Sequence, residues 1–81
     1  MSKKKKIVNQ VIAKNIRYYR SQTILEQGDL GILAFDYHPK NGRNSAQVLI
    51  SKFERGIQEP TATQLYKIAS VLKTDLYKFY K

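Results

Sequence analysis

The segment from Ile50 to Thr61, ISKFERGIQEPT, places a helix end, a glycine and a proline-closed loop within twelve residues. Gly56 stands where a residue in the left-handed conformation commonly ends a helix. Pro60 closes the loop, and Thr61 with Gln64 forms the capping-box pattern that begins another helix. The segment therefore predicts two helices joined by a short connection.

Apolar residues at helical spacing continue on both sides of this connection. Downstream, the spacing i, i+3, i+4, i+7 predicts a helix to about Lys73, with one buried face formed by Leu65, Ile68, Ala69 and Leu72. Upstream, Asn44 or Ser45 is expected to cap a helix at about 45–54, with Val48 or Leu49, Ile50 and Phe53 available to pack. Thr74 or Asp75 is expected to cap a last short helix, which carries Leu76, Tyr77, Phe79 and Tyr80.

The N-terminal half predicts two more helices. A helix at about 8–22 carries one apolar stripe, formed by Val8, Ile12, Ile16 and Tyr19, and a helix at about 26–35 turns Leu30, Leu33 and Ala34 inward. Gly31 is a poor helix former, and we expect it to allow close approach of the next helix. Pro39 and Asn41-Gly42 predict a loop from Phe35 to Asn44. Residues 1–6 are expected to form a flexible basic arm.

These elements predict a compact all-α domain of five helices over residues 7–81. The chain has 81 residues, of which 42% are hydrophobic, so one small core is expected and a dimer interface is a common supplement at this size. No apolar run approaches the roughly 20 residues that cross a bilayer. With no cysteine there is no disulfide framework or thiolate metal site, which favours a reducing cytoplasm.

The charge favours a polyanionic partner. Fifteen Lys and Arg face six acidic residues, and the formal net charge is +9. Such an excess suits DNA, RNA or an anionic membrane surface and does not choose among them.

The order of these signals resembles the phage repressor and Cro-like helix-turn-helix family from Ile12 onward. The resemblance is strongest from Ile50 to Leu76, where IASVLKTDLYKF is similar to the family's fourth helix and the turn into its fifth. Upstream, IRYYR resembles the first helix and LEQGDL the start of the second. The resemblance implies a regulator that binds double-stranded DNA, with the helix at about 45–54 in the major groove, without catalysis, metal or cofactor.

The chain departs from the family's pattern at three points. Glu26 stands where the family usually has Ser or Thr, and Gly31 stands where it usually has Ala. Leu30 and Ile50 are twenty positions apart, which is too far for a tight helix-turn-helix. The long loop between helices 2 and 3 is similar to that of some restriction-modification controller proteins.

The resemblance implies roles for residues of the recognition helix. It places base reading at Gln47, Val48 and Lys52: a glutamine can bond adenine, a valine can touch a thymine methyl, and a lysine can donate to guanine. Val48 as a core residue and Lys52 as a solvated charge are the alternatives. His38, the single histidine, is expected to be an ordinary surface residue.

Other residues are implied to contact the DNA backbone or to hold the fold. Gln27 maps to a family position that contacts a phosphate at a helix N-terminus, where free amides favour an anion. The further candidates for backbone contacts are Lys40, Arg43, Asn44, Ser45 and Arg55, and Lys3 to Lys6 could follow a groove. Arg20 and Glu54 match an ion pair between the first helix and the recognition helix.

The C-terminal aromatic residues are implied to form a homodimer contact. A two-fold dimer would set two recognition helices about 34 Å apart and select a near-palindromic operator. The implied interface consists of Leu76, Tyr77, Phe79 and Tyr80, and the alternative is that Leu76 and one aromatic close the monomer core.

Two functions of other classes stay open. The basic first helix could dock on anionic lipid, although its apolar stripe is needed for the core. The fold could also act as a protein-interaction adaptor that does not use Gln47 and Lys52. Within the class of DNA-binding regulators, these residues do not distinguish a repressor from a restriction-modification controller or an antitoxin.

Overall fold

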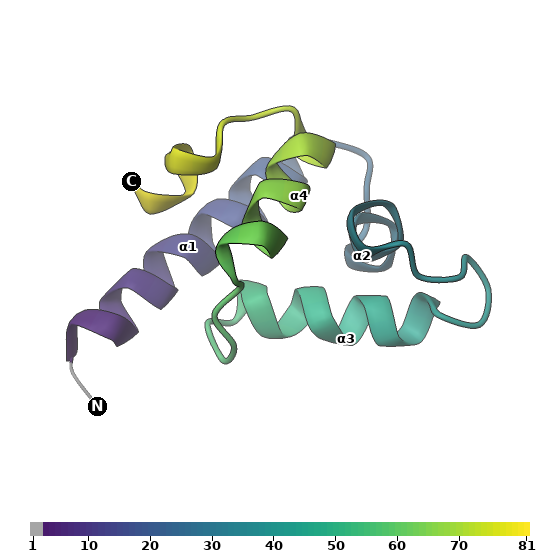
Figure 1. Cartoon of the computed structure of the whole chain (residues 1–81), viewed down its shortest axis with the longest axis horizontal. Coiled ribbons are helices and arrows are strands. Elements are labelled where there is room, and N and C mark those ends of the chain that lie inside the picture. The colour runs from purple at the N-terminus through teal and green to yellow at the C-terminus, as the bar shows by residue number, and fades with distance from the viewer. Residues whose placement is uncertain (1–2) are drawn as a thin grey trace.

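The computed structural model describes the backbone of residues 3–81 and the side chains from Asn9 onward. Over this range the regular secondary structure consists of helices joined by loops, as the predicted all-α class requires. The elements in order are α1 (Lys3–Ser21), α2 (Gln27–Phe35), α3 (Arg43–Glu54), α4 (Ala62–Leu72) and the 3-10 helix η1 (Leu76–Tyr80) (Figure 1). The predicted count of five α-helices is wrong, because the last element is a five-residue 3-10 helix, the form that short helical segments commonly take.

Two helix pairs build the domain. α2 packs mainly on α3 and also touches α4, whereas α1 packs on η1 and α3. In Figure 1, α3 lies along one edge of the molecule, and the C-terminal segment lies near the opposite edge, beside α1. This arrangement leaves one long side of α3 without a covering helix.

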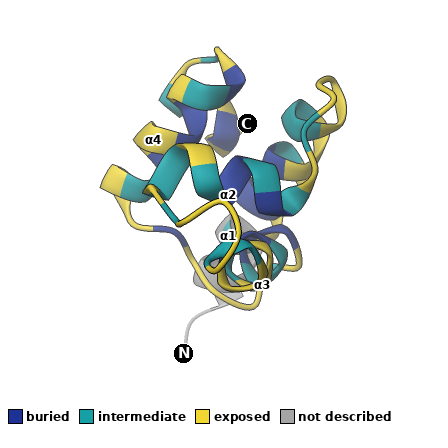
Figure 2. Ribbon diagram, turned by 90° about the vertical axis from the view of Figure 1, so that its right-hand side faces the viewer, coloured by how far each residue is buried: buried dark blue, intermediate teal, exposed yellow. Residues whose placement is uncertain are grey.

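One apolar cluster joins all five elements. The predicted inward faces of α1, α3 and α4 are confirmed, and buried residues lie on the facing sides of the helices (Figure 2). The cluster consists of Ile12, Ile16, Leu30, Ile50, Phe53, Leu65, Ile68, Ala69, Leu72 and Phe79. Tyr19 packs against it as predicted, and the side chain of Val8 lies outside the described residues.

Leu33 was predicted inward but is 59% exposed. Gly31, two positions earlier, faces α3, and two steps along an α-helix turn a side chain to nearly the opposite side. Leu33 therefore points away from α3. Periodicity alone did not identify which face of this nine-residue helix is covered.

The helix ends follow the local signals closely. The Thr61 hydroxyl accepts from the Gln64 amide at 3.1 Å, and Gln64 accepts in return from the Thr61 amide at 2.9 Å, which confirms the capping box. Gly56 has φ 73°, and the amides of Gly56 and Ile57 donate to the carbonyls of Phe53 and Lys52. α3 therefore ends in a Schellman motif, as the glycine predicted.

Two helix starts differ from the prediction. α1 begins at Lys3 and not near residue 8, so the backbone of the proposed basic arm from Lys3 to Lys6 is helical, while residues 1–2 lie outside the described range. α3 begins at Arg43 with Gly42 as its N-cap, which corrects the cap predicted at Asn44 or Ser45. Among the helices of residues 3–81, none has the length and apolar character that a bilayer crossing requires.

Candidate nucleic-acid interface

The uncovered side of α3 carries a continuous polar stripe. The stripe has seven residues, and their spacing along the helix puts all of them on one contiguous face. Five of them are exposed, and Ser51 and Lys52 are half-buried. The stripe, named here the α3 stripe, consists of Asn44, Ser45, Gln47, Val48, Ser51, Lys52 and Arg55. Its side chains offer amide, hydroxyl, ammonium and guanidinium groups, one methyl pair and no carboxylate.

The opposite side of α3 is held tightly against α2 and the core. Ala46, Ile50 and Phe53 are at most 1% exposed. A Cβ atom built on Gly31 would lie 2.6 Å from the Cβ of Ala46 and 2.9 Å from its carbonyl oxygen. The prediction that Gly31 allows close helix approach is confirmed, and α3 is presented as a supported rod.

Arg20 and Glu54 form a bidentate ion pair between α1 and the end of α3. The guanidinium Nη2 donates to Oε1 of Glu54 at 3.0 Å, and Nε donates to Oε2 of the same carboxylate. The Glu54 side chain is only 3% exposed, and this contact raises the pKa of Arg20. The pair lies on the inner side of α3, where it fixes the helix to α1.

Gln27, which was predicted to contact a phosphate, hydrogen-bonds to the carboxylate of the Arg20–Glu54 pair. Its Nε2 donates to Glu54 Oε1 at 3.0 Å, so the side chain is tied to the inner network. An amide nitrogen carries two hydrogens, and one of them is left for another acceptor. Gln27 is thus placed at the first turn of α2 by a contact that sequence reasoning did not identify.

Arg43 lies at the first position of α3 and contacts two carboxylates of the α2 N-terminus. Its Nη1 donates to Asp29 at 2.7 Å and its Nη2 to Glu26 at 3.0 Å. This hydrogen bond with Asp29 lowers the pKa of Asp29 and raises that of Arg43. The predicted loop cation is therefore a helix residue with partners inside the chain, and one of them is Glu26, the N-cap residue of α2.

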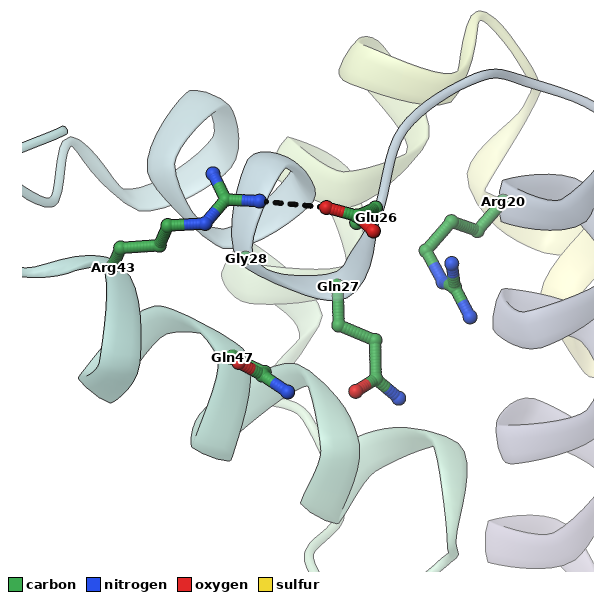
Figure 3. Close-up of a pocket in the computed structure, with 6 residues that line it drawn as sticks. All are labelled: Arg20, Glu26, Gln27, Gly28, Arg43 and Gln47. Atoms are coloured by element: carbon green, nitrogen blue, oxygen red, sulfur yellow. Dashed lines mark hydrogen bonds and ion pairs between the residues drawn. The ribbon is translucent and has the colours of Figure 1, made fainter.

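A polar pocket of ≈ 330 Å³ lies between the N-terminal turn of α2 and α3. Figure 3 shows the side chains of Gln27 and Gln47 beside the same gap, with the guanidinium groups of Arg43 and Arg20 on its two sides. The lining residues are Arg20, Glu26, Gln27, Gly28, Arg43 and Gln47. The pocket thus joins predicted base-contact and backbone-contact residues.

The loop of residues 36–42 leads from α2 to the α3 stripe. Lys40 is exposed there, beside the N-terminus of α3. His38 organises the turn, because its Nδ1 accepts from the amides of Lys40 and Asn41 at 3.1 Å each. His38 is exposed, as expected, but its hydrogen bonds give it a structural role that its position in the sequence did not indicate.

Arg55 extends the α3 stripe beyond the helix end. Its Nε donates to the Ser51 hydroxyl at 3.0 Å, so the guanidinium lies along the exposed face. Arg17, which sequence reasoning did not select, donates to the backbone carbonyl of Glu54 at 3.2 Å. An arginine three positions before Arg20 was the available signal, because that spacing puts both on one side of α1.

The C-terminal aromatic residues divide into two groups. Tyr77 and Tyr80 are 59% and 50% exposed, and Leu76 is half-buried against the core. Phe79, which was predicted for a dimer interface, is instead fully buried; its ring packs edge-on against Tyr19, and its carbonyl accepts from Asn15. Phe79 therefore belongs to the monomer core and is removed from the candidate interface.

Part of the chain matches a family model. Residues 44–79 match the family model described as helix-turn-helix. The matched segment spans most of α3, all of α4 and most of η1, and stops short of α1 and α2. No curated protein and no solved structure matches the chain. The match supports the Cro/C1-type helix-turn-helix family, to which the chain is similar over less than half of its length.

Proposed function

We propose that this protein is a sequence-specific DNA-binding regulator that inserts α3 into the major groove of a duplex. The helix-turn-helix match supports a DNA-binding regulator rather than an enzyme. The observation that carries the finer proposal is the α3 stripe, an exposed and carboxylate-free face on a helix whose other side is anchored. Major-groove recognition uses such a helix face, because base edges there display distinct donors and acceptors. The same role implies a cytoplasmic protein.

Three stripe residues are proposed to read bases. Gln47 is exposed and can make paired hydrogen bonds to adenine. Val48, 45% exposed, lies beside it and can touch a thymine methyl, and its exposure disfavours the alternative core role. Lys52, one turn further along, can donate to guanine O6 or N7.

The flanking polar residues are proposed to hold phosphates. Gln27 and Lys40 lie on α2 and the loop, and Asn44, Ser45 and Arg55 lie at the two ends of the α3 stripe. Contacts of this kind position a protein without reading sequence. Arg43, also predicted for this group, is instead bonded to Asp29 and Glu26 at the N-terminus of α2.

We propose a homodimer on a near-palindromic operator. Tyr77, Tyr80 and Leu76 supply aromatic and apolar surface on the C-terminal segment, away from the α3 edge in Figure 1. A two-fold contact between such surfaces can place two copies of α3 in successive major grooves, about 34 Å apart. The dimer therefore predicts two half-sites one turn apart.

Selection of bound duplexes from a random DNA pool tests this proposal. We expect one preferred motif with two related half-sites, and an affinity that falls steeply as salt rises, because bound Lys and Arg release counterions. Titration of the selected duplex and of a scrambled duplex of equal length gives the specificity ratio.

Two results would contradict it. Equal binding to selected and scrambled duplexes would leave a non-specific polyanion binder. Binding to anionic vesicles with no shift of any duplex would favour the membrane-surface alternative.

A further inference from the structure

The connection between α2 and α3 is too long to set their relative pose through its own geometry. It spans residues 36–42, and the N-cap of α3 is Gly42, which has no side chain to accept from the helix amides. Helices commonly gain such an acceptor at the N-cap. Close packing of Gly31 on Ala46 holds α3 against α2 three residues after Arg43, and the N-terminal end of α3 is left to a contact of its first residue.

Arg43 supplies that contact from the first residue of α3. Its guanidinium donates to Asp29 at 2.7 Å and to Glu26 at 3.0 Å, so one side chain of α3 contacts the N-terminal turn of α2 at two points. Asp29 also accepts from the Glu26 amide at 2.8 Å, which fixes the orientation of its carboxylate. The three charges thus form a connected set across the two helices.

Gly28 makes room for this arrangement. A Cβ atom built on Gly28 would lie 3.1 Å from the Arg43 Cγ and 3.2 Å from its Cζ and Nε. The arginine side chain therefore lies directly over the α2 backbone. A longer residue at position 28 would push it away from its two carboxylates.

We propose that Arg43, Asp29 and Glu26 form a clasp that holds the N-terminus of α3 on α2 and so sets the pose of the recognition helix. The clasp takes the place of the tight turn that this chain lacks. The effect of the clasp on DNA recognition rests on the proposed DNA-binding function. Arg43 is accordingly a positioning residue and not a phosphate contact, because a phosphate beside it would approach two carboxylates.

Amide hydrogen exchange in the free protein tests the clasp without DNA. Exposed ion pairs add little to the free energy of unfolding of a whole domain, so we expect the clasp to affect the local order of the first turn of α3. Arg43→Gln and Asp29→Asn should each speed exchange of the Ala46 and Gln47 amides severalfold, and the double variant should add little. α4 should be unaffected. Lys40→Gln, which removes a neighbouring positive charge outside the clasp, is the control, and unchanged exchange in both clasp variants would overturn the proposal.

The direction in which Asp29→Asn changes DNA affinity distinguishes a positioning role of Arg43 from a direct contact of Arg43 with a phosphate. If the clasp sets the pose, Asp29→Asn lowers affinity for the selected duplex relative to Asp36→Asn, which removes the same charge at the other end of α2. Arg43→Gln then lowers affinity to the same extent, with the salt slope of the wild type.

A direct phosphate contact gives the opposite pattern. Asp29→Asn would free Arg43 and raise affinity above that of Asp36→Asn, and Arg43→Gln would reduce the salt slope by about 0.9. That result overturns the positioning role. If the wild type binds no duplex, the proposed function fails, and the exchange experiment alone decides whether the clasp holds α3.

Discussion

Gln47 lies on the exposed face of α3 and also lines the pocket beside α2. Gln47→Ala is expected to relax preference at one base position and to cost about 1–3 kcal/mol on the preferred duplex, because a paired contact to adenine is lost. Competition titrations with single-base variants of the duplex measure this.

Lys73→Ala supplies the control for the base-reading residues. Lys73 ends α4 and is exposed on another part of the surface. Its loss should leave the order of preferred bases intact, whereas Lys52→Ala, the same change on α3, should alter it. If both variants weakened every duplex equally, Lys52 would not read sequence.

Arg20 and Glu54 differ in exposure, and this difference predicts unequal effects of removing either. The Glu54 side chain is 3% exposed and that of Arg20 is 20% exposed. Arg20→Gln strands a buried carboxylate and is expected to cost about 3 kcal/mol of unfolding free energy. Glu54→Gln leaves the partly exposed guanidinium near water and should cost less. Urea denaturation measures both, and equal losses would show that neither charge is effectively buried.

At the scale of the element, the contact between α2 and α3 depends on a glycine. Gly31→Ala brings a methyl group to 2.6 Å from the Ala46 Cβ, and the resulting overpacking is expected to cost about 1–3 kcal/mol, more than the gain in helix propensity returns.

Gly28→Ala is the matched control for this change, three positions earlier in the same helix. Its new methyl group meets the flexible Arg43 side chain at 3.1 Å, which can shift, and not the backbone of α3. Thermal unfolding should therefore show a clearly smaller loss for Gly28→Ala. A larger loss at Gly28 would mean that the Arg43 contacts, and not the helix approach, dominate this interface.

The clasp also makes helix stability depend on pH. Hydrogen bonds from Arg43 and the Glu26 amide hold the pKa of Asp29 below its usual value near 4. A depressed folded-state pKa stabilises the fold above pH 4, and this contribution is lost as pH falls through the folded-state value. Denaturation at pH 7 and pH 3 should show a smaller decrease in unfolding free energy for Asp29→Asn than for the wild type.

For the whole molecule, the C-terminal segment is proposed to have two separate tasks. Phe79→Ala empties a fully buried site and is expected to cost about 3–5 kcal/mol, which would unfold much of so small a domain. Tyr80→Ser changes a half-exposed side chain and should leave stability nearly intact while weakening the dimer.

Sedimentation and binding to one or two half-sites distinguish these tasks. Tyr80→Ser should bind a single half-site as the wild type does and should lose affinity for the paired site. If it kept full affinity for the paired site, dimerisation through this segment would be wrong.

Local signals were sufficient for much of the fold. The Thr61–Gln64 capping box, the left-handed Gly56 and the apolar spacing of α4 act over a few residues, so the order of residues was enough to identify them. The same holds for the exposed polar face of α3, because the apolar positions that define its inner side are helically spaced. The all-α class and the candidate recognition helix followed from these signals.

Contacts between distant residues established the rest. Leu33 is exposed, Phe79 is buried, Gln27 contacts Glu54, and Arg43 bonds to α2, and each depends on how two helices meet across a loop or across most of the chain. Helix periodicity ranks which face is apolar but does not say which neighbour covers it. The sequence alone was thus enough to predict the helices and most of their caps. The pose of α3 and the partners of its charged residues were set only by the tertiary structure, because those interactions join groups that are far apart along the chain.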